Sequence, residues 1–265
     1  MPWTLTDDDQ ELYFEVAGDG PPLVFAGGFG GIADVWSAQV DELRDEFTCV
    51  TYDLRGYGRS DKPLPAVRYG VERHARDVAT VMDAAGIDSA VLVGHSMGGN
   101  TMMQLALDEP RRAQALVLAA SFAAGAQLVE AAGEFDVLGF IKDSVRRRQA
   151  RYEFFLSSGA TEDVALETTK WPTYTLLGNL ESFIAFEARE RLGELDLPVL
   201  VLHGDADVVA PLDPCGRYLA DTLANARLEV LAEGNHCPMI QRPDWFNEHL
   251  RTFARSILGT EAVTS

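Results

Sequence analysis

The chain of 265 residues is poor in cysteine, in basic side chains and in long apolar runs, and each shortage excludes a class of protein. Its three cysteines, Cys49, Cys215 and Cys237, are odd in number and widely spaced, which fits neither a disulfide framework nor a zinc site. Unpaired cysteines indicate a reducing compartment. No segment is long and apolar enough to span a membrane. Residues 1–9 lack the basic and apolar regions of a signal peptide, so we expect a cytoplasmic protein.

Basic residues are also outnumbered by acidic ones. Lys and Arg total 22 against 41 Asp and Glu, which gives a formal net charge of −19. Such an acidic surface repels nucleic acids and anionic membranes, so we expect neither as a partner. Apolar residues make up 47% of the chain, enough for a sizeable core in one large α/β domain or two small ones. The expected partner is a small-molecule substrate, bound by a monomer or a homodimer.

Buried strands alternate with amphipathic helices along much of the chain. Polar and apolar residues alternate over 11–17, which predicts a half-exposed strand, and short apolar runs elsewhere predict buried strands. This alternation predicts a parallel sheet covered by helices on both faces. The apolar runs lie at 23–26, 48–52, 87–93, 115–119, 198–203 and 227–231, and the helical patterns at 33–47, 71–85, 101–107, 215–223 and the end of the chain.

The pattern changes after Ser121. Residues 122–195 contain no clear buried strand and are typical of several helices rich in aromatic side chains. A helical insertion between two strands predicts a cap or lid over a core formed by 1–121 and 196–265. A few of the aromatic side chains should line the substrate pocket, but the sequence does not say which. The basic run Arg146-Arg147-Arg148 is expected to be a solvated helix face.

The chemistry centres on Gly94-His95-Ser96-Met97-Gly98, which joins an apolar run to a helical pattern. A strand that breaks sharply into a helix at a serine strains the serine backbone and exposes its hydroxyl above the sheet. The tight turn leaves no room for side chains at Gly94 and Gly98. The following helix offers the free N–H of Met97 to a developing negative charge. Ser96 is therefore predicted to be the nucleophile.

A serine hydroxyl needs a base, and the base needs an acid that fixes its tautomer. Among five histidines, His236 alone follows the last strand in a polar loop, at the end of the sheet where Ser96 emerges. It is the predicted base. Asp205 and Asp207 both follow the preceding strand. Asp207 lies three residues past Gly204, far enough to turn back toward His236, and is the favoured acid, whereas Asp205 is expected to cap the turn.

The other histidines have less suitable places. His95 adjoins Ser96, but neighbouring side chains at such a turn point in different directions. His203 is expected to be buried at a strand end. His74 and His249 lie within helical patterns and are expected to be surface or packing residues.

The chain order Ser96, Asp207, His236 is that of α/β-hydrolases, and the chain resembles the lid-bearing, esterase-like members of that superfamily. The resemblance covers nearly all of the chain except the lid. It implies an α/β fold with a mostly parallel central sheet, helices on both faces, and a helical lid inserted between two strands. The matching segments specify fold and triad strongly and substrate weakly; they are 94–99, 53–60, 204–207 and 234–236.

The resemblance further implies that the backbone N–H groups of Phe29 and Met97 form the oxyanion hole. The family's first oxyanion loop usually reads His-Gly-x-Gly, whereas this chain has Gly at position 27. That histidine generally braces the loop, so activity need not be lost. The ring of Phe29 is expected to flank the acyl pocket. Loop 53–61 is expected to brace the glycine loop rather than take part in catalysis, and Asn235 departs from the usual Gly-His before the base.

The first functional hypothesis is a carboxylic ester or lactone hydrolase that acts on a small, fairly apolar molecule and needs neither cofactor nor metal. A second is a carbon–carbon bond hydrolase of vinylogous diketones, which predicts little turnover of aryl esters. A third is a slow ligand-sensing signalling hydrolase, because segments 28–30 and 236–238 are similar to those of bacterial stress-response regulators and plant butenolide receptors. Epoxide hydrolases and haloalkane dehalogenases use a carboxylate nucleophile, and Ser96 disfavours them.

Overall fold

The computed structural model describes residues 2–65, 68–130 and 137–259, and its strands form one mixed sheet. The strand order is β1-β2-β4-β3-β5-β6-β7-β8. β1 pairs antiparallel with β2, and β2 with β4, whereas β3 to β8 run parallel. The strands are β1 (Trp3–Leu5), β2 (Glu11–Ala17), β3 (Pro22–Ala26), β4 (Thr48–Tyr52), β5 (Ala90–His95), β6 (Ala113–Ala119), β7 (Val199–Gly204) and β8 (Ala226–Leu231).

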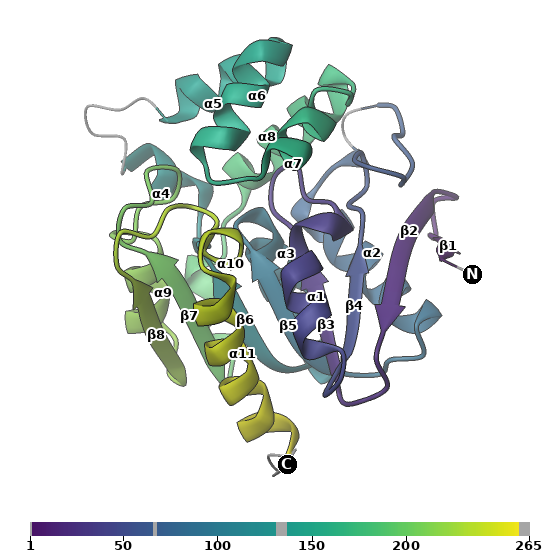
Figure 1. Cartoon of the computed structure of the whole chain (residues 1–265), viewed down its shortest axis with the longest axis vertical. Helices are drawn as coiled ribbons and strands as arrows, with labels where there is room; N and C mark the ends of the chain where they lie inside the picture. The colour runs from purple at the N-terminus through teal and green to yellow at the C-terminus, as the bar shows by residue number, and fades with distance from the viewer. Residues whose placement is uncertain (1, 66–67, 131–136, 260–265) are drawn as a thin grey trace.

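Helices cover both faces of this sheet. α1 and α11 lie on one face and α2, α3 and α9 on the other (Figure 1). The helices are η1 (Ala33–Trp36), α1 (Ser37–Leu43), α2 (Val71–Ala84), α3 (Met97–Asp108), η3 (Pro110–Arg112), α4 (Gly125–Glu130), α5 (Val137–Arg146), α6 (Arg148–Ser157), α7 (Glu162–Thr168), α8 (Thr173–Ala185), η4 (Arg189–Glu194), α9 (Gly216–Thr222), α10 (Pro238–Gln241) and α11 (Pro243–Leu258).

The sheet separates two apolar cores because successive side chains of a strand point to opposite faces. In β3, Val24 and Ala26 join the core under α2 and α3, whereas Leu23 and Phe25 join the core under α1 and α11. Both faces are buried, so the central strands are continuous apolar runs without polar alternation. The predicted α/β class and the mostly parallel sheet are confirmed.

Helices α4 to α8 and η4 are inserted between β6 and β7 and are called the lid below. The lid lies over the edge of the sheet at which the parallel strands end (Figure 1). It belongs to the predicted insertion 122–195, of which residues 131–136 lie outside the described part of the chain. Substrate between sheet and lid would be shielded from water on both sides.

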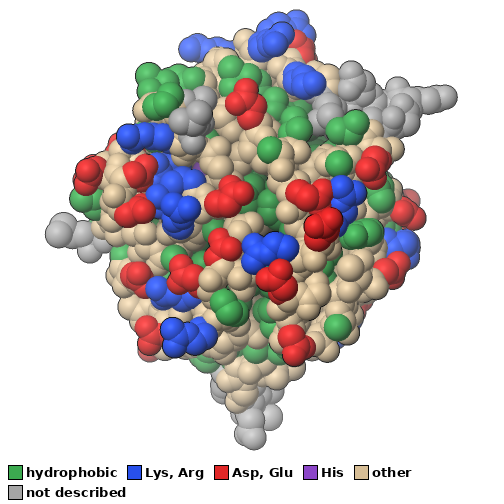
Figure 2. Space-filling view, turned by 180° about the vertical axis from the view of Figure 1, so that it is seen from behind, with side chains coloured by type: hydrophobic (Ala, Val, Ile, Leu, Met, Phe, Trp, Pro, Cys, Tyr) green, Lys and Arg blue, Asp and Glu red, His purple; other side chains and the backbone are tan. Residues whose placement is uncertain are grey.

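Charged side chains of both signs are mixed over the face opposite to α1 and α11, and basic groups gather at its upper end, over the lid (Figure 2). Arg146, Arg147 and Arg148 are exposed where α5 meets α6, which confirms the expected solvated face. None of the described helices combines the length and the apolar character needed to cross a membrane.

Candidate active site

Ser96 occupies a strained turn between β5 and α3. Its backbone has φ 53° and ψ −124°, a conformation that non-glycine residues avoid and that costs about 1–3 kcal/mol. The turn is held by Ser96 N–H, which donates to the Ala119 carbonyl at 2.8 Å, and its tightness leaves no space for a side chain at Gly98. A Cβ there would lie 2.2 Å from the Ala26 carbonyl oxygen. The strained elbow predicted from the sequence is present.

Asp207 and His236 come together at the ends of the neighbouring strands β7 and β8. His236 Nδ1 donates to Asp207 Oδ2 at 2.8 Å, and Asp207 Oδ1 accepts the amides of Val209 and Ala210 at 2.8 and 3.0 Å. Burial alone would raise the pKa of Asp207, but the attraction of His236 and hydrogen bonds from His203 and His236 outweigh burial and lower this pKa. Asp207 is therefore ionised at neutral pH.

Asp205, the other candidate acid, does not reach His236 in this arrangement. Asp205 is exposed at the start of the same loop, whereas Asp207 is 5% exposed. An exposed carboxylate cannot fix the tautomer of a buried imidazole that already bonds to another carboxylate. The structure thus joins His236 to Asp207, and the catalytic roles of Ser96, Asp207 and His236 follow from this arrangement as predictions.

His95 links the two loops that carry Ser96 and His236. Its Nε2–H donates to the backbone carbonyl of His236 at 2.7 Å, and the two rings lie 4.9 Å apart. Burial, helped by the proximity of His236, lowers the pKa of His95 to about 3, so the ring is a neutral donor at working pH. Sequence reasoning assigned no role to His95, because its partner is 141 residues away.

His203 lies behind Asp207. It is fully buried, as expected for a strand end, and its Nε2 donates to the Ala210 carbonyl at 2.7 Å. The same nitrogen lies 3.5 Å from Asp207 Oδ2. Asp207 is thus surrounded by donors on both oxygens.

The glycine loop after β3 passes directly beside Ser96. A Cβ on Gly28 would lie 2.9 Å from Cβ of Ser96, so only a residue without a side chain allows this approach. In the described part of the chain, neither the Phe29 nor the Met97 amide donates to a backbone carbonyl. Met97 is the first residue of α3, where amides have no partner within the helix. Both N–H groups are therefore available to an oxyanion.

Loop 53–61 contacts the glycine loop and the turn that follows it: Leu54 N–H donates to the Gly31 carbonyl at 3.3 Å. Asp53 Oδ1 accepts the Ala33 amide at 2.8 Å, and Asp53 Oδ2 accepts the Arg59 amide at 2.8 Å. Arg55 is fully buried and pairs with Asp77 at 2.8 Å. These charges stabilise loops and lie away from the pocket described next.

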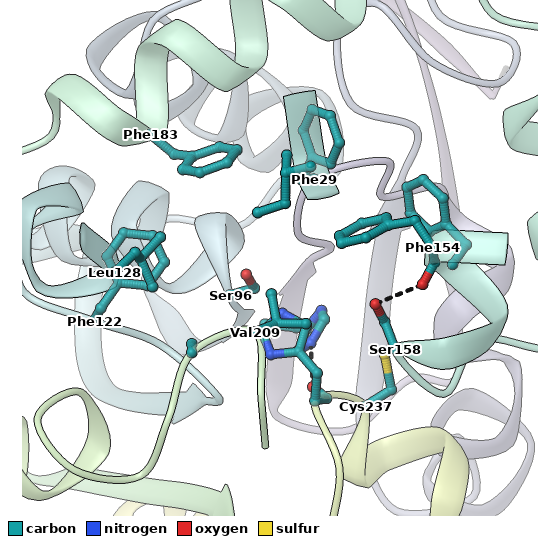
Figure 3. Close-up of a pocket in the computed structure, with 14 residues that line it drawn as sticks. Phe29, Ser96, Phe122, Leu128, Phe154, Ser158, Phe183, Val209 and Cys237 are labelled. Atoms are coloured by element: carbon teal, nitrogen blue, oxygen red, sulfur yellow. Dashed lines mark hydrogen bonds between the residues drawn. The ribbon is translucent and has the colours of Figure 1, made fainter. Parts of the chain in front are cut away.

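A pocket between sheet and lid contains Ser96 and His236. Phe183, Leu128 and Phe122 lie on one side of Ser96 (Figure 3). Phe154, Ser158 and Cys237 lie on the other side. The full lining is Phe29, His95, Ser96, Phe122, Leu128, Ile141, Phe154, Phe155, Ser158, Phe183, Val209, Ala210, His236 and Cys237.

The lining is almost wholly apolar. None of the described lining residues is Lys, Arg, Asp or Glu. Apart from Ser96 and the two histidines, the polar group in the wall is the Ser158 hydroxyl, which donates to the Phe154 carbonyl at 2.8 Å. The lid residues of this wall were not predicted individually, because their aromatic pattern does not distinguish pocket from lid core. In the described residues, no three His, Cys, Asp or Glu side chains are placed to hold one metal ion.

Comparison with known proteins places the chain among hydrolases. A family model described as the alpha/beta hydrolase fold matches residues 21–243. The chain is 30% identical over 259 residues to the "Putative carbamate hydrolase RutD" of Azorhizobium caulinodans, with 94% of this chain and 97% of that protein covered.

Two solved structures are similar over nearly their whole length. Est816, described as an N-acyl homoserine lactone degrading enzyme, is 29% identical with a TM-score of 0.73, covering 95% of this chain and 100% of that one. The enol-lactonase from Burkholderia xenovorans LB400 is 25% identical with a TM-score of 0.79, covering 95% and 99%.

Proposed function

The chain is a hydrolase of the α/β-hydrolase family, and from this premise we propose that it cleaves the carboxylic ester or lactone bond of a small, uncharged, apolar molecule through an acyl-enzyme on Ser96. The observation that carries the proposal is the pocket, in which a strained serine and a carboxylate-paired histidine face a wall of phenylalanines. A charged substrate would lose its hydration there without gaining a partner.

The proposed reaction uses Ser96, His236 and Asp207 together with two backbone amides. His236 takes the proton of Ser96, whose oxygen attacks the carbonyl carbon. The amides of Phe29 and Met97 hold the oxyanion, and each such donor is typically worth about 3 kcal/mol. His236 then protonates the leaving group, and a water activated by His236 releases the acid. Asp207 holds His236 in the tautomer with Nδ1 protonated throughout.

The size of the pocket points to short acyl groups. Its cavity volume is about 50 Å³. A dry engineered cavity of about 150 Å³ holds benzene, so the closed pocket has room for only a few carbon atoms. We therefore expect acetyl to butyryl esters and small lactones to react faster than longer homologues.

The relatives support hydrolysis at an acyl carbon, but their names differ in the kind of bond that is cleaved. Est816 and the enol-lactonase are named for lactones, and RutD for a carbamate. The absence of any cationic side chain among the described lining residues favours a neutral ester or lactone over an anionic substrate. We propose a cytoplasmic location on the ground that all three cysteines are free and buried.

The test compares wild type with Ser96→Ala on p-nitrophenyl esters of increasing acyl length and on small lactones followed by pH-stat. Turnover that falls with chain length and vanishes in the variant supports the proposal. Equal rates in both proteins would refute the role of Ser96. A folded wild type that is labelled at Ser96 by a fluorophosphonate, yet hydrolyses none of these compounds, would refute the substrate class. Vinylogous diketones and butenolides would then be tested.

A further inference from the structure

The lid contacts the glycine loop through the ring of Phe29. Phe155, from α6, stacks on this ring with centroids 6.1 Å apart and an interplanar angle of 12°. Phe183, from α8, meets it edge-on at 5.6 Å and 73°. Tyr57, from the core, closes a further side at 6.4 Å and 87°. Two separate lid helices therefore hold a single side chain of the core.

The lid also presses on the backbone of the loop. Gly30 has φ 80°, a conformation that favours glycine. A Cβ at this position would lie 2.4 Å from Cζ of Phe155 and 3.2 Å from Cζ3 of Trp171. The closed lid thus occupies the space beside Gly30 and permits no larger residue there.

We propose that the lid positions the oxyanion hole: Phe155 and Phe183 act through the Phe29 ring to hold the Phe29 amide where the oxyanion forms. The inference rests on the proposed function, which assigns the donor role to that amide. It makes Phe155 and Phe183 positioning residues for the chemical step, in addition to walls of the pocket.

The physical reason lies in the composition of the loop. Residues 27–31 contain four glycines around Phe29, and glycine has the greatest backbone freedom to lose. An oxyanion donor is effective only within about 2.7–3.1 Å of the developing charge. Bonds of the loop itself, such as Gly31 N–H to the Gly28 carbonyl at 2.7 Å, leave the Phe29 ring to be fixed by its aromatic neighbours. Those neighbours come mainly from the lid.

The consequence is a site that is complete only under a closed lid. When the lid moves away to admit substrate, Phe29 loses Phe155 and Phe183 together, and its amide loses its fixed position. When the lid closes, the same two contacts exclude water and restore the donor. Lid contacts should therefore control kcat, whereas residues that only line the wall should change KM and the preferred chain length.

The experiment replaces the carbonyl oxygen of a short-chain ester by sulfur, because sulfur is a weak hydrogen-bond acceptor. The ratio of kcat/KM for the oxo ester to that for the thiono ester then measures how well the oxyanion donors are placed. This ratio is compared in wild type, Phe155→Ala and Phe155→Leu. Leu128→Ala is the matched control: Leu128 lines the same pocket from α4, on the side of Ser96 opposite to Phe154 (Figure 3), and its truncation removes apolar volume without removing an aromatic ring that packs on Phe29.

We expect Phe155→Ala to lower kcat for every acyl length and to lower the oxo-to-thiono ratio by about tenfold to a hundredfold, below the loss that follows removal of a whole donor. Phe155→Leu, which keeps an apolar side chain against Gly30, should retain part of the wild-type kcat and part of the wild-type oxo-to-thiono ratio. Leu128→Ala should shift the preference toward longer chains and keep the ratio. A Phe155→Ala enzyme with the wild-type ratio would overturn the proposal.

A second variant tests the route through the ring and does not depend on the stability of the lid. Phe29→Ala keeps the amide but removes the ring, so its ratio should fall as in Phe155→Ala, and the double variant should fall no further. If the losses of the oxo-to-thiono ratio in the two single variants multiply in the double variant, the two residues act independently, and action of Phe155 through the Phe29 ring is refuted. If Phe155 and Phe29 prove independent while turnover still depends on Ser96, the inference about the lid is refuted and the proposed function is unaffected. Absence of turnover in wild type would refute the proposed function itself.

Discussion

Replacement of Asp207 by Asn should abolish most of the activity by changing the tautomer of His236. The carboxylate accepts three hydrogen bonds: the amides of Val209 and Ala210 at Oδ1 and His236 Nδ1 at Oδ2, 2.8 Å away. An asparagine has one oxygen to accept these hydrogen bonds and an NH₂ group that can only donate.

The magnitude follows from the two possible orientations of the amide. If its oxygen faced His236, its NH₂ would face the amides of Val209 and Ala210, and two buried donors would be left unpaired at about 1–3 kcal/mol each. The oxygen therefore stays with the two amides, and NH₂ faces His236 Nδ1. Nδ1 must then accept, which moves the imidazole proton to Nε2, and the base can no longer take the Ser96 proton. Such a tautomer change costs about four orders of magnitude in kcat.

The assay is kcat on a short-chain p-nitrophenyl ester at pH 7, with circular dichroism and a melting curve to show that the variant is folded. Asp205→Asn is the matched control, because it makes the same chemical change two residues away on an exposed side chain and should leave kcat unchanged. A folded Asp207→Asn enzyme with kcat within tenfold of wild type would refute the assignment of the acid. Loss of activity in Asp205→Asn alone would transfer that role.

Three further outcomes follow from single contacts. His95→Leu, which removes the 2.7 Å bond to the His236 carbonyl, should lower kcat by about tenfold, a cost of the order of one hydrogen bond, and His95→Gln should restore much of it in the same ester assay. Gly98→Ala places a Cβ 2.2 Å from a backbone oxygen and should lower the free energy of unfolding by about 3 kcal/mol in urea titrations. The hydrogen bond from Arg55 lowers the pKa of Asp8, so Asp8 stabilises the fold above its unfolded pKa near 4 and loses this effect as pH falls. The difference between the urea midpoints of wild type and Asp8→Asn should therefore be constant from pH 7 to about pH 5 and begin to shrink below about pH 4. A difference at pH 3 as large as that at pH 7 would contradict this.

Strands with a clear local pattern could be predicted from the sequence. The alternation over Glu11–Ala17 and the apolar run Thr48–Tyr52 predict β2 and β4 with the bounds that the structure has. β5 is shifted, at Ala90–His95 against the predicted 87–93, because the apolar run itself does not mark where strand pairing begins. β1, Trp3–Leu5, was not predicted, because three residues cannot show a period and this strand exists only by pairing with β2.

The lid could be predicted as a set of helices but not in its contacts with the core. Whether Phe155 or another aromatic residue meets Phe29 depends on how the lid helices are rotated and placed above the sheet, and helical spacing alone carries no such information. The pairing of Arg55 with Asp8 and Asp77 was likewise beyond the sequence, since it joins the N-terminal turn, a loop and α2. Contacts of this kind are set by packing between elements.

For His236, the predicted base, sequence position and structural contact again give different kinds of information. Its place after the last strand predicts this role from the sequence, and the structure adds a chemical argument for the prediction: which nitrogen each buried histidine has free. His95 and His203 both donate Nε2–H to carbonyl oxygens, which can only accept, so their unprotonated nitrogen is Nδ1. His236 donates Nδ1–H to Asp207 and leaves Nε2 unprotonated in the pocket. Of these three histidines, His236 alone presents Nε2 as a base, and Asp207→Asn would give it the tautomer of the other two.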